Sequence, residues 1–191
     1  DGALIFTNSE DQDLYRLTGE DRCERLTSVA NTRFADVSMC AAGNRLYAVA
    51  ERHANGHDEA PENFLSLVRL PAGETRAIRR GADFYATPRV SPDGKRLAWL
   101  EWNLPDMPWQ SAALYVAEIA SDGSLEKPVH IAGGSDNPAF QCEWDEDGVL
   151  YFVLESGEWS QLWAWTEGAT KQVSTVPGEL ARPLWALGMR S

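Results

Sequence analysis

One pattern of turn and strand occurs three times along the chain at a nearly constant interval. The copies span residues 37–46, 88–97 and 142–150, and in each a glycine precedes a strand rich in apolar and aromatic side chains. The three glycines, 51 and 54 positions apart, are Gly43, Gly94 and Gly148. A period of about 40–55 residues with four strands per unit is typical of a β-propeller. This period therefore predicts an all-β protein, a partial propeller of about four four-stranded antiparallel blades.

The local chemistry of the repeat agrees with that prediction. Pro-Asp-Gly and Glu-Asp-Gly place glycine where a tight turn between antiparallel strands needs positive φ. The strand that follows, residues 97–100 for example, is apolar at successive positions, as expected for a strand covered on both faces by neighbouring blades. Residues 60–63 and 105–111 are the expected longer loops. Strands are expected at residues 3–7, 14–18, 45–50, 64–70, 96–102, 113–119, 149–154 and 161–165.

The repeat divides the chain into blades at about residues 1–30, 31–82, 83–134 and 135–177, with the start of a further blade at 178–191. The first blade lacks its first strand. We expect large aromatic side chains to fill the wedge between blades: Trp99, Trp144, Trp163, Trp165 and Trp185. An arc of about four blades leaves unpaired edges and an uncovered face. We therefore expect the chain to belong to a larger ring or to self-associate through those edges.

Charge and cysteine content narrow the possible partners. The 191 residues include 17 Lys and Arg and 29 Asp and Glu, a net charge of −12. That balance argues against nucleic acid and against anionic membrane surfaces as partners. Cys23, Cys40 and Cys142 form no C-x-x-C pair, so we expect buried free thiols in a cytoplasmic setting, with no metal and no cofactor. The chain opens on Asp1 without an initiator Met, and we interpret it as a fragment.

A longer stretch around the second copy resembles a known family. It comprises residues 84–100, the loop Trp-Asn-Leu-Pro-Asp-Met-Pro-Trp at 102–109, and Leu-Tyr-Val-Ala at 114–117. Further matches lie at residues 33–36, 51–53, 140–144, 150–153 and 183–188. Together they resemble the amino-terminal propeller of prolyl oligopeptidase-family serine peptidases, in particular the acylaminoacyl-peptidase and dipeptidyl-peptidase-like branch. The resemblance covers nearly the whole chain, and the loop at 102–109 is its most specific part.

The resemblance implies a role beside a catalytic domain. In that family a carboxy-terminal α/β-hydrolase domain carries a Ser-Asp-His triad, and the propeller covers it and restricts access to short peptides. That hydrolase domain is absent from this sequence. The nearest approach to a nucleophile elbow, at residues 133–137 around Ser135, lacks the last glycine of G-x-S-x-G. We therefore expect no catalytic residue here. The expected role is gating and positioning short peptide or acyl-peptide substrates for the hydrolase domain of the same polypeptide.

Two groups of side chains are candidates for that role. Glu51 and His53 are expected either to line the central cavity and meet a substrate's amino terminus, or to belong to a solvated loop with His57. Trp102, Met107 and Trp109 are expected either to pack over the blade or to contact the hydrolase domain or the substrate. The acidic residues 145–147 resemble a calcium loop but lack its spacing and terminal Glu, so we interpret them as a hairpin turn.

Two other functions are consistent with a propeller. The first is a stand-alone Tol-type propeller that acts as a protein-interaction module. The second is a metal-dependent lactonase-like propeller, for which no convergent set of ligands is found in the sequence. Fold alone does not choose among these possibilities.

Overall fold

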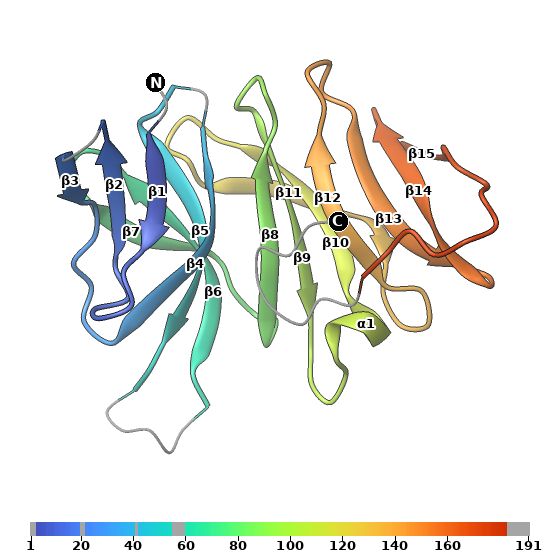
Figure 1. Ribbon diagram of the computed structural model, residues 1–191, viewed down its shortest axis with the longest axis horizontal. Coiled ribbons are helices and arrows are strands. Elements are labelled where there is room, and N and C mark those ends of the chain that lie inside the picture. Colours follow the sequence, from blue (N-terminus) through green and yellow to red (C-terminus); the bar gives the residue numbers. More distant parts are fainter. Residues whose placement is uncertain (1–2, 20–21, 41, 55–59, 183–191) are drawn as a thin grey trace.

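The computed structural model describes residues 3–19, 22–40, 42–54 and 60–182. Its strands form four antiparallel sheets in which each strand pairs with its neighbour in sequence. We call them blades one to four. Blade one has three strands: β1 (Leu4–Thr7), β2 (Leu14–Thr18) and β3 (Arg22–Arg25). Figure 1 shows the blades following one another from β1–β3 on the left to β12–β15 on the right.

The other three blades have four strands each. Blade two consists of β4 (Thr32–Met39), β5 (Arg45–Arg52), β6 (Glu62–Arg69) and β7 (Glu74–Arg79). Blade three consists of β8 (Phe84–Val90), β9 (Arg96–Trp102), β10 (Ala113–Ile119) and β11 (Leu125–Gly133). Blade four consists of β12 (Ala139–Trp144), β13 (Leu150–Ser156), β14 (Trp159–Thr166) and β15 (Ala169–Gln172). The predicted all-β partial propeller is confirmed.

The repeated turns have one geometry. Gly43, Gly94 and Gly148 have φ values of 67°, 72° and 80°, the conformation for which the turn needs glycine. The amide of each glycine donates to the carbonyl oxygen three residues earlier, at distances of 2.8, 2.8 and 3.2 Å. The turns therefore join the first and second strands of blades two, three and four in the same way.

Apolar side chains fill the space between adjacent blades. In β5, Leu46, Ala48 and Ala50 pack towards blade one, whereas Tyr47 and Val49 pack towards blade three. This alternation explains why the second strand of a blade is apolar at every position. A third cluster joins blades three and four and includes Leu100, Leu114, Leu150, Phe152 and Trp165.

The tryptophans behave largely as the sequence predicts. Trp99 is fully buried between blades two and three. Trp165 is buried between blades three and four, where Trp144 and Trp163 pack against the same cluster. Trp144 meets Trp165 edge to face at 6.1 Å between ring centroids. Trp185 lies outside the described residues.

Some local expectations differ from the structure. The loop predicted at residues 105–111 contains the short helix α1 (Pro108–Ser111), which starts at a proline whose fixed φ suits a first helical position. Strand β6 begins at Glu62, so part of the other predicted loop is extended. Cys40 and Cys142 are buried as expected, but Cys23 is exposed because β3 is a short outer strand of blade one.

Candidate functional site

The end of β5, the start of β6 and the β9–β10 connection lie at the same end of the propeller, the lower end in Figure 1. Glu51 is next to last in β5 and pairs in register with Arg33 on β4 and Asn63 on β6. The β9–β10 connection carries α1 and begins directly after Trp102. Both groups of residues singled out from the sequence therefore lie at one end of the propeller, which we call the loop end.

Glu51 and His53 form a polar pair at the loop end. His53 Nε2 lies 2.5 Å from Glu51 Oε1, and Arg33 Nη1 lies 3.6 Å from the same oxygen. The His53 amide donates to the Asn31 carbonyl at 2.8 Å, which fixes the backbone as it leaves β5. Both side chains of the pair remain partly exposed. The arrangement holds a carboxylate in place and leaves it accessible to a cationic group. His57 lies outside the described residues.

Asp83 connects the ends of blades two and three. Its carbonyl accepts a hydrogen bond from Asn63 Nδ2 at 2.8 Å. Its amide donates to Asn103 Oδ1 and its Oδ2 accepts from the Leu104 amide, both at 2.9 Å. The loop after β9 is thus tied to the strand that pairs with Glu51. The polar pair and the loop belong to one connected structure.

The three apolar loop residues have different environments. Trp102 is only 9% exposed and stacks on Phe84 with 5.4 Å between ring centroids, so it packs within blade three. Trp109 is half-buried on α1. Met107, the residue that caps α1, is 43% exposed, and Leu104 is 61% exposed. Met107 and Leu104 are therefore the most exposed large apolar side chains of this loop.

A second set of polar side chains joins the first strands of blades two, three and four. It was not among the residues predicted from the sequence. Each of these strands has a register irregularity at the same point of the repeat. Asp36, Thr87 and Gln141 stand there with φ of 48°, 48° and 50°. Such bulges re-aim side chains out of the regular pleat. Here they bring polar side chains of three blades together.

Arg89 is the centre of this inner-strand network. Its Nη1 lies 3.0 Å from Asp36 Oδ1 and its Nε lies 2.8 Å from Glu143 Oε1. The Arg89 and Asp36 side chains are 7% and 3% exposed, whereas Glu143 is 47% exposed. Burial disfavours the charged guanidinium, but the two carboxylates outweigh it and hold the pKa of Arg89 above its ordinary value. The network thus fastens blades two, three and four to one another.

A signal for this network was present in the sequence. Ser38, Arg89 and Glu143 recur at the same 51- and 54-residue spacing as the turn glycines. The Val90 amide donates to Ser38 Oγ at 3.1 Å, so all three equivalent positions make contacts between blades. Repeated polar residues at inner-strand positions would have pointed to these contacts.

The described part of the chain holds neither a nucleophile elbow nor a metal site. Ser135 lies between β11 and β12, after Gly133 and Gly134, and not at a turn from strand to helix. Across residues 3–182, apart from the gaps given above, no cluster of three or more His, Cys, Asp or Glu side chains is arranged to hold a metal ion. No helix in the same residues has the length and apolar character needed to cross a membrane.

Comparisons with known proteins find peptidases among the proteins that this chain resembles. No family model matches it. A curated relative, dipeptidyl-peptidase 5 of Porphyromonas gingivalis, is 25% identical over 136 residues, which are 69% of this chain and 19% of that protein. A puromycin-hydrolysing peptidase of Mycobacterium tuberculosis has a TM-score of 0.85 at 29% identity, over 97% of this chain and 31% of its own.

Another solved structure, a puromycin hydrolase, has a TM-score of 0.86 at 30% identity and matches 98% of this chain and 31% of its own. The chain thus spans about a third of the length of these structures and about a fifth of the curated relative. A likeness in fold alone extends to TolB of Acinetobacter baumannii, with a TM-score of 0.62 at 14% identity over 91% of this chain and 41% of its own.

Proposed function

We propose, from the premise that this chain is a propeller segment of the prolyl oligopeptidase family, that it gates and positions short peptide or acyl-peptide substrates for an α/β-hydrolase domain of the same polypeptide. The observation that carries this proposal is the extent of the match. Nearly all of this chain aligns with about a third of each solved peptidase. In this role the chain contributes no nucleophile, and the reaction, acyl transfer to water, belongs to the other domain.

The loop end supplies the groups for positioning. The Glu51 carboxylate, held between His53 and Arg33, accepts a hydrogen bond from the ammonium group of a peptide amino terminus. A charge-assisted hydrogen bond of this kind is roughly twice as strong as a neutral one and has a defined direction. It therefore fixes one end of a short peptide relative to the reacting carbonyl.

The exposed apolar side chains of the same end supply the contact with the hydrolase domain. Leu104 and Met107 project from the loop that Asp83 fastens to blade two. Their burial against a partner removes apolar surface from water, a favourable term of roughly 25 cal/mol per Å². The inner-strand network of Asp36, Arg89 and Glu143 supports the role by keeping three blades in a fixed relation.

A stand-alone propeller of the Tol type, acting as a protein-interaction module, is the second candidate. The likeness in fold to TolB favours it, although at 14% identity this likeness concerns the fold alone. The two candidates differ in the size and reactivity of the polypeptide that carries the chain.

A fluorophosphonate probe separates the two candidates. Lysate of the source organism is labelled and blotted with an antibody against this chain, whose own mass is 21.2 kDa. A labelled band well above that mass is expected, because a serine hydrolase domain on the same polypeptide reacts with the probe. An unlabelled band near 21 kDa would overturn the peptidase role and favour the interaction module.

Variants of the labelled polypeptide test the positioning role of Glu51. Glu51→Gln is expected to raise KM about tenfold for peptides with a free amino terminus, because a charge-assisted hydrogen bond is lost. N-acetylated peptides are expected to be unaffected. Glu62→Gln, which removes a carboxylate at the neighbouring end of β6, is the matched control. Equal effects on both substrate types would exclude amino-terminal recognition by Glu51.

A further inference from the structure

The seam between blades two and three is closed by an arginine. Arg45, two residues after the turn glycine, donates through Nη2 to the carbonyl of Ser121 in the β10–β11 turn. Arg69 donates to the next carbonyl, that of Asp122, at 2.7 Å. A Cβ on Gly123 would lie 2.7 Å from Leu67 Cδ2, so the turn approaches blade two as closely as its backbone permits. The turn of the following blade thus fills this seam.

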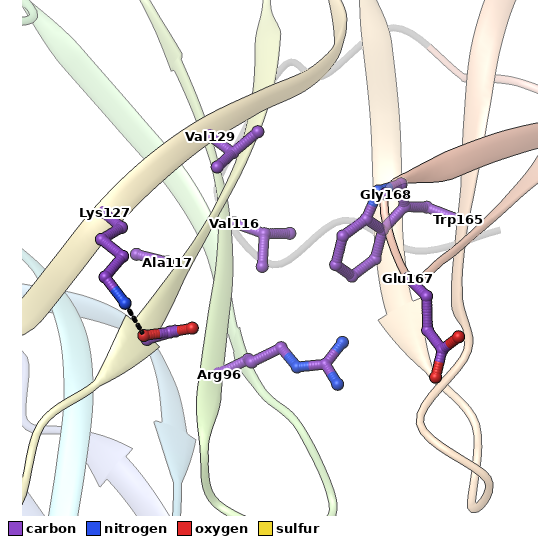
Figure 2. Close-up of a pocket in the computed structure, with 9 residues that line it drawn as sticks. Arg96, Val116, Ala117, Lys127, Val129, Trp165, Glu167 and Gly168 are labelled. Carbon is purple, nitrogen blue, oxygen red and sulfur yellow. Dashed lines mark hydrogen bonds and ion pairs between the residues drawn. The ribbon is translucent and has the colours of Figure 1, made fainter.

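The corresponding seam between blades three and four is open. Arg96 follows Gly94 as Arg45 follows Gly43, but its guanidinium carbon lies 5.5 Å from the centre of the Trp165 ring and 5.9 Å from that of Trp144. Among the described residues no carboxylate lies within ion-pair distance of Arg96, and its guanidinium makes no hydrogen bond. The β14–β15 turn, at Glu167 and Gly168, stays apart from it, and a cavity of about 330 Å³ remains (Figure 2).

This space, which we call the Arg96 cavity, combines an apolar wall with a charged rim. Figure 2 shows Val116 and Val129 on one side and the Trp165 ring on the other. Lys127 and Glu118 neutralise each other at the rim through an ion pair of 3.1 Å. The exposed Glu167 stands at the opposite rim. Arg96 thus stacks on two tryptophan rings and has no carboxylate partner within the part of the chain that the structure describes. In the equivalent seam the Arg45 guanidinium donates to a carbonyl oxygen, so we expect Arg96 to bind an oxygen acceptor as well.

We propose that the Arg96 cavity binds a small organic carboxylate that carries an apolar or aromatic group, such as an N-acylated apolar amino acid. The carboxylate accepts hydrogen bonds from the Arg96 guanidinium, a pairing that suits the planar donors of arginine. The apolar group lies against Val116, Val129 and Trp165, and an amide N–H of the ligand faces Glu167. The cavity lies in the seam between two blades, so this binding is independent of the loop end.

Binding is tested with N-acetyl-L-phenylalanine by calorimetry and saturation-transfer NMR on this chain. Its carboxamide, which has the same shape without the charge, is the matched ligand control. The acid is expected to bind and the amide to bind at least tenfold more weakly, because the pairing with Arg96 is charge-assisted. Equal affinity of acid and amide, or no binding of the acid at millimolar concentration, would overturn the proposal.

Variants test whether the acid binds in the Arg96 cavity. Arg96→Gln is expected to weaken binding of the acid at least tenfold, whereas Arg45→Gln, at the equivalent position of the closed seam, leaves it unchanged. Val129 is 55% exposed, so substitutions there do not disturb the core. Val129→Glu is expected to weaken binding of the acid by charge repulsion and Val129→Lys to preserve or strengthen it. If Val129→Glu and Val129→Lys changed affinity in the same direction, the carboxylate would not lie where we place it.

Discussion

At the scale of single residues, Trp99 shows how one side chain can hold two blades together. Its ring is fully buried, stacks on Tyr115 at 5.7 Å and donates from Nε1 to Glu101 Oε2 at 2.8 Å. Arg79 of blade two also pairs with Glu101, at 2.7 Å. Packing and polar contacts between the blades therefore converge on this side chain.

Trp99→Ala tests that role directly. Truncation of a large buried aromatic costs about 3–5 kcal/mol, from the lost burial and the cavity left behind. It also removes the indole donor to Glu101. The free energy of unfolding is measured by urea denaturation, with Trp159→Ala on an exposed tryptophan as the control. A loss below about 1 kcal/mol would show that Trp99 does not fill the seam.

Arg89 presents a different energetic problem, because its partner Asp36 is almost fully buried. Removal of one partner of a buried ion pair leaves an uncompensated charge and typically costs about 3–5 kcal/mol. Arg89→Met is therefore expected to destabilise the chain by that amount. Arg16→Met, which removes the partly exposed partner of Glu24, is expected to cost less than about 1 kcal/mol.

The Arg89 measurement has an internal check. The double variant Asp36→Leu with Arg89→Met removes both charges, and it is expected to recover much of the loss. If the double variant were as unstable as the sum of the single variants, the loss would come from packing and not from an unpaired charge. The comparison uses the same urea denaturation.

The three thiols are expected to differ in reactivity. The thiolate is the form that attacks a thiol reagent, and burial raises the pKa of Cys142 to about 11. The thiol of Cys142 therefore stays protonated and shielded at pH 8, and Cys40 is shielded as well. Titration of the folded chain with a disulfide reagent should show one rapidly reacting thiol per chain. The Cys23→Ser variant should show none. Three fast equivalents in the folded chain would contradict the buried positions of Cys40 and Cys142.

At the scale of elements, the β9–β10 connection depends on Asp83 for its conformation. Asp83→Ala removes the carboxylate that accepts the Leu104 amide. Because the core is untouched, stability is expected to fall by only about 1 kcal/mol, whereas hydrogen exchange at Leu104 should become markedly faster. Asp106→Ala, in the same loop, is the matched control. Unchanged exchange at Leu104 in the Asp83 variant would show that the loop is held by other contacts.

The elements also show what the sequence could predict and why. The sequence predicts strands β2, β9 and β10 with the limits that the structure has, because apolar runs and turn residues mark them locally. Helix α1 was missed because its four residues are too few to show a helical period. The contacts around Arg89 were missed for another reason. They join residues more than 50 positions apart, and only the relative placement of the blades brings them together.

At the scale of the whole molecule, blade four has an outward face that no other blade covers within the described residues, and Val153 on this face is 6% exposed. Leu150, Phe152 and Leu154 pack towards blade three. Four residues at the alternate positions of β13 and β14 belong to none of the three apolar clusters between blades. They form two cross-strand pairs, Tyr151 with Ala164 and Val153 with Leu162. Because side chains alternate across a strand, these residues lie on the opposite face. In blades two and three, both faces of the sheet are covered.

We expect this outward face to be covered by a second copy when the chain is alone in solution. Contact between two such faces buries apolar surface and shields sheet edges that otherwise invite pairing. Static light scattering over a range of concentrations should therefore show self-association. Leu162→Asp, which places a charge on the outward face, should shift the chain towards the monomer, whereas Val129→Asp, on exposed β11 of blade three, should not. A monodisperse monomer of the unmodified chain at every concentration would show that the outward face needs no cover.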